Sequence, residues 1–501
     1  MSETESKKES AVPVETTEKA AAGNGDNQSD KKKNNRNNNK RKFVGGKYGK
    51  NKRMGKDNNK KNKQKTTVDF KARNQKRDEV HQGSYAHKAM RDLFNVSLPE
   101  MDKLQAEQAE LAEKGERKAE YQENNSSEPK VPKRKVALLI QFIGTKYCGM
   151  QINEGQQTIQ SEIELALYKA GLLAATNFGI PGKYSWSNSA RTDKGVHSCA
   201  QVCSCKILLP TEDMNEIREM INKELPDDIN IADVVRVSKT FCARTQRDKV
   251  RYQYILPSFA LSTSESVQEI FGKVMNKEIN EKERNLKDPF TKDEKIALQN
   301  EFRKIRVDAN GLDRLKEALA TYEGTHKFHN YTSGKTFTDA SASRYILSFT
   351  VQDPVVDKHG MEWIPCQVVG QSFLLHQIRK MMSMAMDAAR GSSSTDIMKQ
   401  SFSDKYMNVN TAPAQGLFLD MSYFESFNRR PNAGDPLDWY SDPTAPATQR
   451  WKEFKEDKVM THIMDEEERQ GNFVDYLYTQ ENHNKYANYD AVDEKKSKRD
   501  N

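Results

Sequence analysis

A long basic, asparagine-rich stretch near the start of the chain limits most strongly which residues can fold. Residues 31–77 contain 20 Lys or Arg and two acidic residues, a net charge of +18. Few apolar side chains are available there to offset the conformational entropy that ordering the backbone would cost. We therefore predict a disordered basic tail and linker over residues 1–130, with the folded part starting near Val131.

The rest of the chain has the opposite charge balance. All 501 residues together carry a formal net charge of +8, so those outside 31–77 sum to −10. The clusters Lys31–Lys33 and Lys40–Lys42 are typical of nuclear import signals, and a run of this charge attracts polyanions such as RNA. We expect a nuclear protein that uses the import machinery. A purely solubilising arm is the alternative interpretation.

Signals for membrane insertion or secretion are absent from the sequence. No run of 18 apolar residues could span a bilayer, and the first residues lack the apolar segment of a secretory signal. The six cysteines include no CxxC pair, so we expect a reduced, intracellular protein without a membrane partner.

One group of residues raises the question of zinc. His197, Cys199, Cys203 and Cys205 are close enough in sequence to suggest a metal site. Alternate residues of a strand share a face, however, and small buried cysteines are common there. Burial is the favoured interpretation, and a structural zinc is the alternative.

The spacing of apolar residues predicts an α+β fold. The expected strands are 136–142, 202–209, 229–237, 249–256, 343–352, 362–369 and 416–419. Helices are expected after Thr158, around 217–221 and 312–322, and over 372–390. Two successive αβ units of this kind predict mainly antiparallel sheets. The expected domains are 131–262, a charged insertion 263–308, a second unit 309–425, and a C-terminal extension 426–501.

A turn in the first unit carries the most informative chemistry. Asp193-Lys194-Gly195 is a turn signal, since Asp accepts from the backbone two residues on and Gly adopts positive φ. The carboxylate lies between the cations Arg191 and Lys194 and precedes a strand. Taken alone, this carboxylate is either a turn cap or a nucleophile.

Six blocks in fixed order indicate a family. They read YCGMQ (147–151), ARTDKGVH (190–197), FCAR followed by RY (241–252), GTHKF (324–328), SFLLHQIRKM (372–381) and APAQGL (412–417). The chain thereby resembles the TruA-type pseudouridine synthases, and most of all the eukaryotic, fungal multisite nuclear tRNA enzymes. It departs from many bacterial members at Ala190, where they carry Gly, and at Cys242, where they carry His.

The resemblance implies a fold and a reaction. Two similar units would flank a central basic cleft, and uridine in tRNA would be isomerised to pseudouridine without a cofactor. Asp193 would be the essential carboxylate, acting at the base or at the sugar. Arg379 would orient it and Tyr252 would stack on the uracil. Arg191 would fill the space of the flipped base, and Leu417 would form part of the pocket floor.

RNA contacts and partners are less closely specified by the sequence. The candidate phosphate binders are Arg244, Arg247, Lys249 and Arg251. Whether small nuclear and messenger RNAs are also substrates stays open. The insertion and the C-terminal extension could cover a dimerisation surface of smaller relatives, so we expect a monomer. The alternative function is a catalytically inactive RNA-binding or chaperone protein on the same scaffold.

Overall fold

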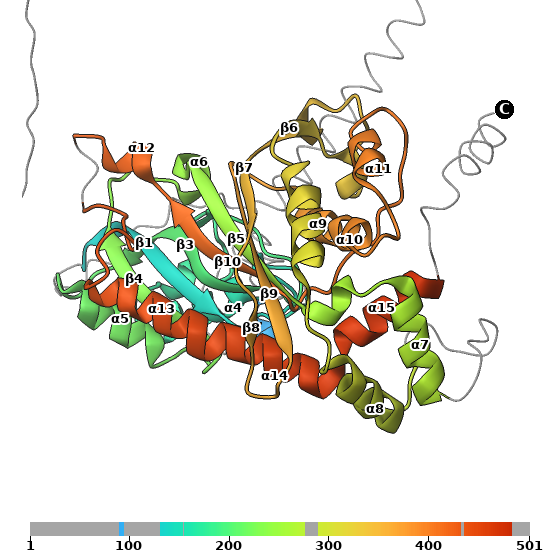
Figure 1. Cartoon of the computed structure of the whole chain (residues 1–501). Helices are drawn as coiled ribbons and strands as arrows, with labels where there is room; N and C mark the ends of the chain where they lie inside the picture. Colours follow the sequence, from blue (N-terminus) through green and yellow to red (C-terminus); the bar gives the residue numbers. More distant parts are fainter. Residues whose placement is uncertain (1–89, 95–130, 154, 276–288, 432–434, 483–501) are drawn as a thin grey trace, which may run out of the picture. The chain divides into compact units, whose positions relative to one another are not determined.

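The computed structural model of the chain describes residues 90–94, 131–153, 155–275, 289–431 and 435–482 (Figure 1). Most of the predicted disordered tail therefore lies outside the described residues. Residues 90–94 are helical, and Met90 is buried in the core of the first unit. No helix in these ranges is both long and apolar enough to cross a membrane.

The strands of the described residues join in one ten-stranded sheet, which confirms the α+β class (Figure 1). They are β1 Lys133–Phe142, β2 Ser187–Asn188, β3 His197–Leu208, β4 Ile229–Arg236, β5 Lys249–Pro257, β6 Gly324–Lys327, β7 Ser343–Val351, β8 Val355–Val356, β9 Glu362–Gly370 and β10 Leu417–Tyr423. The order is β4-β1-β3-β10-β5-β9-β7-β6, with β2 paired to β3 and β8 to β9. The described pairs are antiparallel, except that β10 runs parallel to β3.

The sequence predicted a separate sheet for each unit, and this was wrong. Strand β10, from the end of the second unit, lies between β3 and β5 of the first and makes the sheet continuous. Its residues are buried except for partly exposed Tyr423, and most of β3 is buried as well. Strands that are buried on both faces lie in the middle of a sheet, where no backbone edge is left unpaired.

Helices cover the sheet in groups that follow the units. α4 Ile159–Lys169 and α5 Met214–Asn222 pack on the first unit, and a capping box at Thr158 begins α4. α9 Ala309–Ala320 packs against β7 and α10 Gln377–Ala389. The shorter helices are η1 Ala175–Asn177, α6 Ala243–Gln246, η2 Ser258–Leu261, η3 His329–Tyr331, η4 Ala340–Ala342, α11 Thr395–Gln400 and α12 Glu425–Asn428.

The described part of the predicted insertion, 263–308, forms two helices. α7 Ser264–Met275 and α8 Lys292–Phe302 contact each other, and both contact α15 Asn472–Asn482 near the C-terminus. Phe271 and Phe302 are buried in this contact region. Each of these helices has a charged face as well as the apolar stripe on which it packs. The many charged residues made the helical pattern hard to recognise in the sequence.

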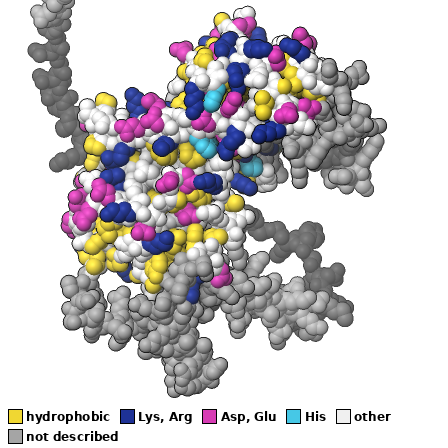
Figure 2. Space-filling view, turned by 90° about the horizontal axis from the view of Figure 1, so that it is seen from below, with side chains coloured by type: hydrophobic (Ala, Val, Ile, Leu, Met, Phe, Trp, Pro, Cys, Tyr) yellow, Lys and Arg dark blue, Asp and Glu magenta, His cyan; other side chains and the backbone are white. Residues whose placement is uncertain are grey.

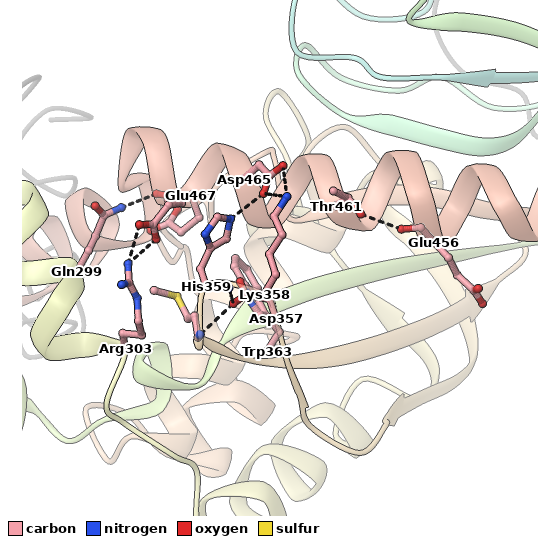
Figure 3. A network of polar contacts seen from close by, with 12 residues as sticks. Gln299, Arg303, Asp357, Lys358, His359, Trp363, Glu456, Thr461, Asp465 and Glu467 are labelled. Carbon is pink, nitrogen blue, oxygen red and sulfur yellow. Dashed lines mark hydrogen bonds and ion pairs between the residues drawn. The ribbon is translucent and has the colours of Figure 1, made fainter.

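The C-terminal extension forms one long helical run along the sheet (Figure 1). It consists of α13 Pro446–Glu453, the π-helix η5 Phe454–Met460, and α14 Thr461–Gln470. At one end Arg450 Nε donates to Ala232 O of β4 at 2.7 Å. Toward the other end Asp465 accepts from Lys358 and His359, in the turn between β8 and β9 (Figure 3). The extension therefore ties the first unit to the second.

Candidate active site

The loop that carries Asp193 is held tightly on both sides. Val196 N donates to Asp193 O at 3.2 Å, and Gly195 has a φ of 79°, which confirms the predicted turn. On the other side Met150 N donates to Thr192 O at 3.3 Å. A Cβ at Gly149 would lie 2.8 Å from Thr192 O, so only glycine permits this approach. The backbone of the loop is therefore fixed, and 17% of the Asp193 side chain is exposed.

The parallel pairing of β3 with β10 brings a second loop to the same place. His197 pairs with Phe418, so the segments that precede the two strands lie side by side. A Cβ at Gly195 would be 3.5 Å from Ala414 Cβ. Leu417 starts β10 opposite Tyr254 of β5 and is buried. Blocks about 220 residues apart in sequence thus meet where the central strands β3 and β10 begin.

Tyr252 reaches the same region from β5. It pairs with Leu419 of β10 and Val368 of β9, and its ring lies nearly perpendicular to that of Phe373 at a centroid distance of 5.5 Å. Burial raises the pKa of its phenol, and the negative charge of Asp193 raises it further. The phenol therefore keeps its proton at neutral pH, close enough to Asp193 to sense its charge.

Arg379 approaches from α10, and its contacts differ in part from the expectation. Its Nε donates to Ala412 O at 2.7 Å, which anchors the loop before β10. Burial lowers the pKa of the guanidinium, while the charges of Tyr254 and Asp193 act against that lowering. Arg379 therefore lies within electrostatic reach of Asp193. Among the described residues, however, the basic side chain within 4 Å of the Asp193 carboxylate is that of His376, with 3.8 Å between Oδ2 and Nε2.

His376 is a residue that the sequence interpretation missed. The apolar pattern predicted a helix from Ser372, but α10 begins only at Gln377, because His376 has a φ of 61°. Residues with this backbone conformation cannot continue an α-helix. The block SFLLHQIRKM contains the signal by which His376 could have been found, since it places a His three residues before Arg379.

Three of the four candidate phosphate binders have partners within the protein, and two of these are arginines. Arg247 donates to Ser189 O at 2.6 Å and to Gln371 O at 2.8 Å, so it links the Asp193 loop to the turn after β9. Arg251 Nε pairs with Asp420 at 2.6 Å. Both guanidinium groups therefore already have short bonds to protein oxygens.

The other predicted RNA contacts lie nearer the surface. The side chains of Arg191 and Arg244 are exposed. Lys249 Nζ pairs with Glu425 at 2.9 Å and lies 4.9 Å from the centre of the Tyr423 ring. Exposed pairs of this kind are weak and exchange readily, so Lys249 can still meet an anion.

The zinc alternative gains no support from the described residues. His197 is buried, its Nδ1 accepts from Gly144 N at 3.0 Å, and burial lowers its pKa to about 3. Cys199 lies in a different core cluster from Cys203 and Cys205. Burial raises the pKa of all three thiols, whereas zinc binds thiolates. Within the described ranges no three His, Cys, Asp or Glu residues are grouped so that they could hold a metal ion.

Comparison with known proteins decides the family. A family model described as tRNA pseudouridine synthase matches residues 138–245 and 318–425, one segment in each predicted unit. A mouse protein named "Pseudouridylate synthase 1 homolog" is 32% identical over 361 residues, which cover 71% of this chain and 75% of the mouse protein. The chain belongs to the tRNA pseudouridine synthase family. The TruA-type resemblance of the sequence blocks is thereby confirmed.

Fungal members of the family align less completely. Proteins named "tRNA pseudouridine synthase 1" are 34% identical in Kluyveromyces lactis and 33% identical in Saccharomyces cerevisiae. The alignments cover 62% and 60% of this chain. The chain spans just under two thirds of these relatives, 64% and 63% of their lengths. Asp193, Arg379 and Leu417 lie inside the segments that match the tRNA pseudouridine synthase model, whereas Tyr252 lies between them.

Proposed function

We propose that this chain isomerises uridine to pseudouridine in tRNA. The observation that supports the proposal is that the turn of Asp193 lies against the loop before β10, which Arg379 holds through Ala412 O. The charge of Asp193 also acts on both Tyr252 and Arg379. Asp193 supplies the carboxylate, Arg379 orients it electrostatically, and Tyr252 stacks on the uracil. The names of the relatives support the same reaction and the same class of RNA.

The proposed chemistry balances without a cofactor. The bond between C1′ of the ribose and N1 of the uracil breaks, the base rotates, and a bond forms between C1′ and C5. C5 loses a proton and N1 gains one, so no atom is added or removed overall. A carboxylate ionised at neutral pH suits the nucleophilic or electrostatic role. The raised pKa of Tyr252 favours stacking for this residue over proton abstraction.

RNA binding is part of the proposal. The target base leaves its stack, which costs a few kcal/mol, and contacts in the site repay that cost. Arg191 fills the vacated space, Leu417 supports the base, and Arg244 and Lys249 contact the backbone of the RNA in a basic cleft between the units. On the face in Figure 2, basic and acidic side chains intermingle. We therefore assign long-range attraction of the RNA mainly to the basic residues 31–77.

One substitution tests the chemistry. We expect Asp193→Asn to lower turnover of unmodified tRNA at least about a thousandfold, as loss of a catalytic group does. Pseudouridine is mapped in the RNA after incubation with purified full-length protein. Asp353→Asn is the matched control, because Asp353 is exposed and lies between β7 and β8. Undiminished product from Asp193→Asn would exclude the proposed role of this carboxylate.

The same assay separates the enzyme from an inactive RNA-binding protein. If the wild-type chain binds tRNA tightly but forms no pseudouridine, the binding protein on the same scaffold is the better description. Small nuclear and messenger RNA fragments are included as further substrates. Product from these RNAs would extend the substrate class beyond tRNA.

Nuclear localisation and a monomeric state complete the proposal. The clusters Lys31–Lys33 and Lys40–Lys42 support recognition by the import machinery. Deleting residues 1–80 is expected to reduce nuclear retention while leaving turnover on saturating tRNA nearly unchanged. A collapse of turnover would make the tail part of the catalytic machinery instead. Sedimentation of the full chain at several concentrations tests the monomer.

A further inference from the structure

His376 has a backbone conformation that is unusual for a residue with a side chain. It occupies the third position of the turn 374–377, which Gln377 N closes by donating to Leu374 O at 3.1 Å. Its φ of 61° and ψ of 2° fall where glycine or asparagine is normally found. In the described ranges, Ser185 is the other residue besides glycine with a positive φ.

This conformation places the imidazole beside the catalytic carboxylate. Nε2 lies 3.8 Å from Asp193 Oδ2, and 35% of the His376 side chain is exposed. The ring does not cap α10, although His376 is its N-cap residue. Leu374 N donates to Gln377 Oε1 at 2.8 Å, which stabilises the turn independently of the imidazole. The turn therefore has its own support, and the imidazole is left to face Asp193.

We infer that His376 is a positioning residue for Asp193, an inference that rests on the proposed function. His376 directly precedes α10, and Arg379 lies in the first turn of that helix. Arg379 Nε is bound to Ala412 O, whereas the imidazole has Asp193 as its partner. A distance of 3.8 Å exceeds that of a hydrogen bond. At this distance the imidazole restricts rotation of the Asp193 carboxylate while leaving the carboxylate oxygens free to react.

Strain in the backbone supports a functional role. Residues in sparsely populated regions of φ and ψ persist where the surrounding structure enforces them, and they gather at active sites. Glycine would adopt the same turn more easily.

A pair of substitutions separates the side chain from the backbone. His376→Gly removes the imidazole and relieves the positive φ, and His376→Gln keeps an N–H donor of similar reach. We expect kcat on tRNA to fall about tenfold in His376→Gly, as misplaced catalytic groups cause, with KM nearly unchanged. His376→Gln is expected to recover most of the loss. Ser185→Gly is the matched control, since it relieves the same strain outside the site, and its kcat is expected to stay at the wild-type value.

Several outcomes would overturn this role. A wild-type kcat in His376→Gly would show that the imidazole does not position Asp193. A kcat in His376→Gln as low as in His376→Gly would assign the effect to the turn. A rise in KM alone would indicate an RNA contact. Absence of pseudouridine from the wild-type chain would instead overturn the proposed function, and this inference with it.

Discussion

Asp193 and Asp420 are two carboxylates at the same junction of strands, yet their surroundings differ sharply. Asp420, on β10, has no exposed surface, and it contacts Arg251 Nε at 2.6 Å, Gln253 Nε2 at 3.1 Å and Lys455 Nζ at 3.4 Å. Asp193 is partly exposed, and its contact with the imidazole of His376 spans 3.8 Å. A carboxylate with close cations on both sides is occupied by the protein itself. A carboxylate held by its backbone, with distant partners, remains available to a substrate.

The largest expected effect on stability distinguishes these two carboxylates. Asp420→Asn leaves Arg251 and Lys455 without a counter-charge in a mostly buried setting. We expect the free energy of unfolding to fall by about 3 kcal/mol, the lower end for a broken buried ion pair, since both cations keep some contact with water. Urea unfolding measures it. Asp193→Asn is the control, and its unfolding free energy is expected to change by less than about 1 kcal/mol. A larger loss in Asp193→Asn would contradict the comparison.

The next largest effect concerns the guanidinium near Asp193. Arg379→Lys loses the Nε bond to Ala412 O, and a lysine cannot hold this loop and face the carboxylate at once. We expect kcat on saturating tRNA to fall about a hundredfold, as for displaced catalytic groups. Arg314→Lys is matched, because Arg314 Nε donates to Ala389 O at 2.6 Å, also a backbone oxygen. Equal kcat values in Arg379→Lys and Arg314→Lys would show that Arg379 has no specific role in the active site.

Local features of the site were predictable from the sequence, whereas long-range ones were not. The Asp193 turn follows from its own residues, since Asp and Gly define the turn chemistry. The position of β10 between β3 and β5 follows from contacts between segments about 220 residues apart, which leave no local pattern. A two-unit interpretation therefore missed the continuous sheet, although the strands themselves were largely predicted.

The internal partners of individual cations could not be predicted from the sequence. Arg247 and Arg251 resemble phosphate binders in sequence, but Ser189 O and Asp420 reach them through tertiary contacts. The start of α10 was misjudged for a related reason. Propensity favours a helix from Ser372, and the positive φ of His376 is set by the turn and its surroundings.

The smallest expected effect concerns a third carboxylate, Glu467 of α14, which is buried without a close cation among its described hydrogen-bond partners. Phe473 N donates to both oxygens at 3.0 Å, and Gln415 Nε2 donates to Oε2 at 2.7 Å. Burial raises the pKa of Glu467 to about 8, while these neutral donors lower it only in part. Because the folded chain then holds a proton that the unfolded chain releases, raising the pH from about 5 to 8 lowers the free energy of unfolding.

Replacing this carboxylate by its uncharged analogue tests the sign of that effect. In Glu467→Gln the decline in Tm between pH 7 and pH 8.5 is expected to become shallower by a few degrees, because no proton is released there. Thermal unfolding at both pH values measures it. Glu164→Gln is the matched control, since burial raises the pKa of Glu164 only to about 7, and this group acts mainly at lower pH. If Glu467→Gln kept the wild-type decline, neutral donors alone would suffice to hold a buried carboxylate in its charged form. In that case the nearby cations Arg251 and Lys455 would contribute less to the difference between the buried Asp420 and the partly exposed Asp193 than we infer.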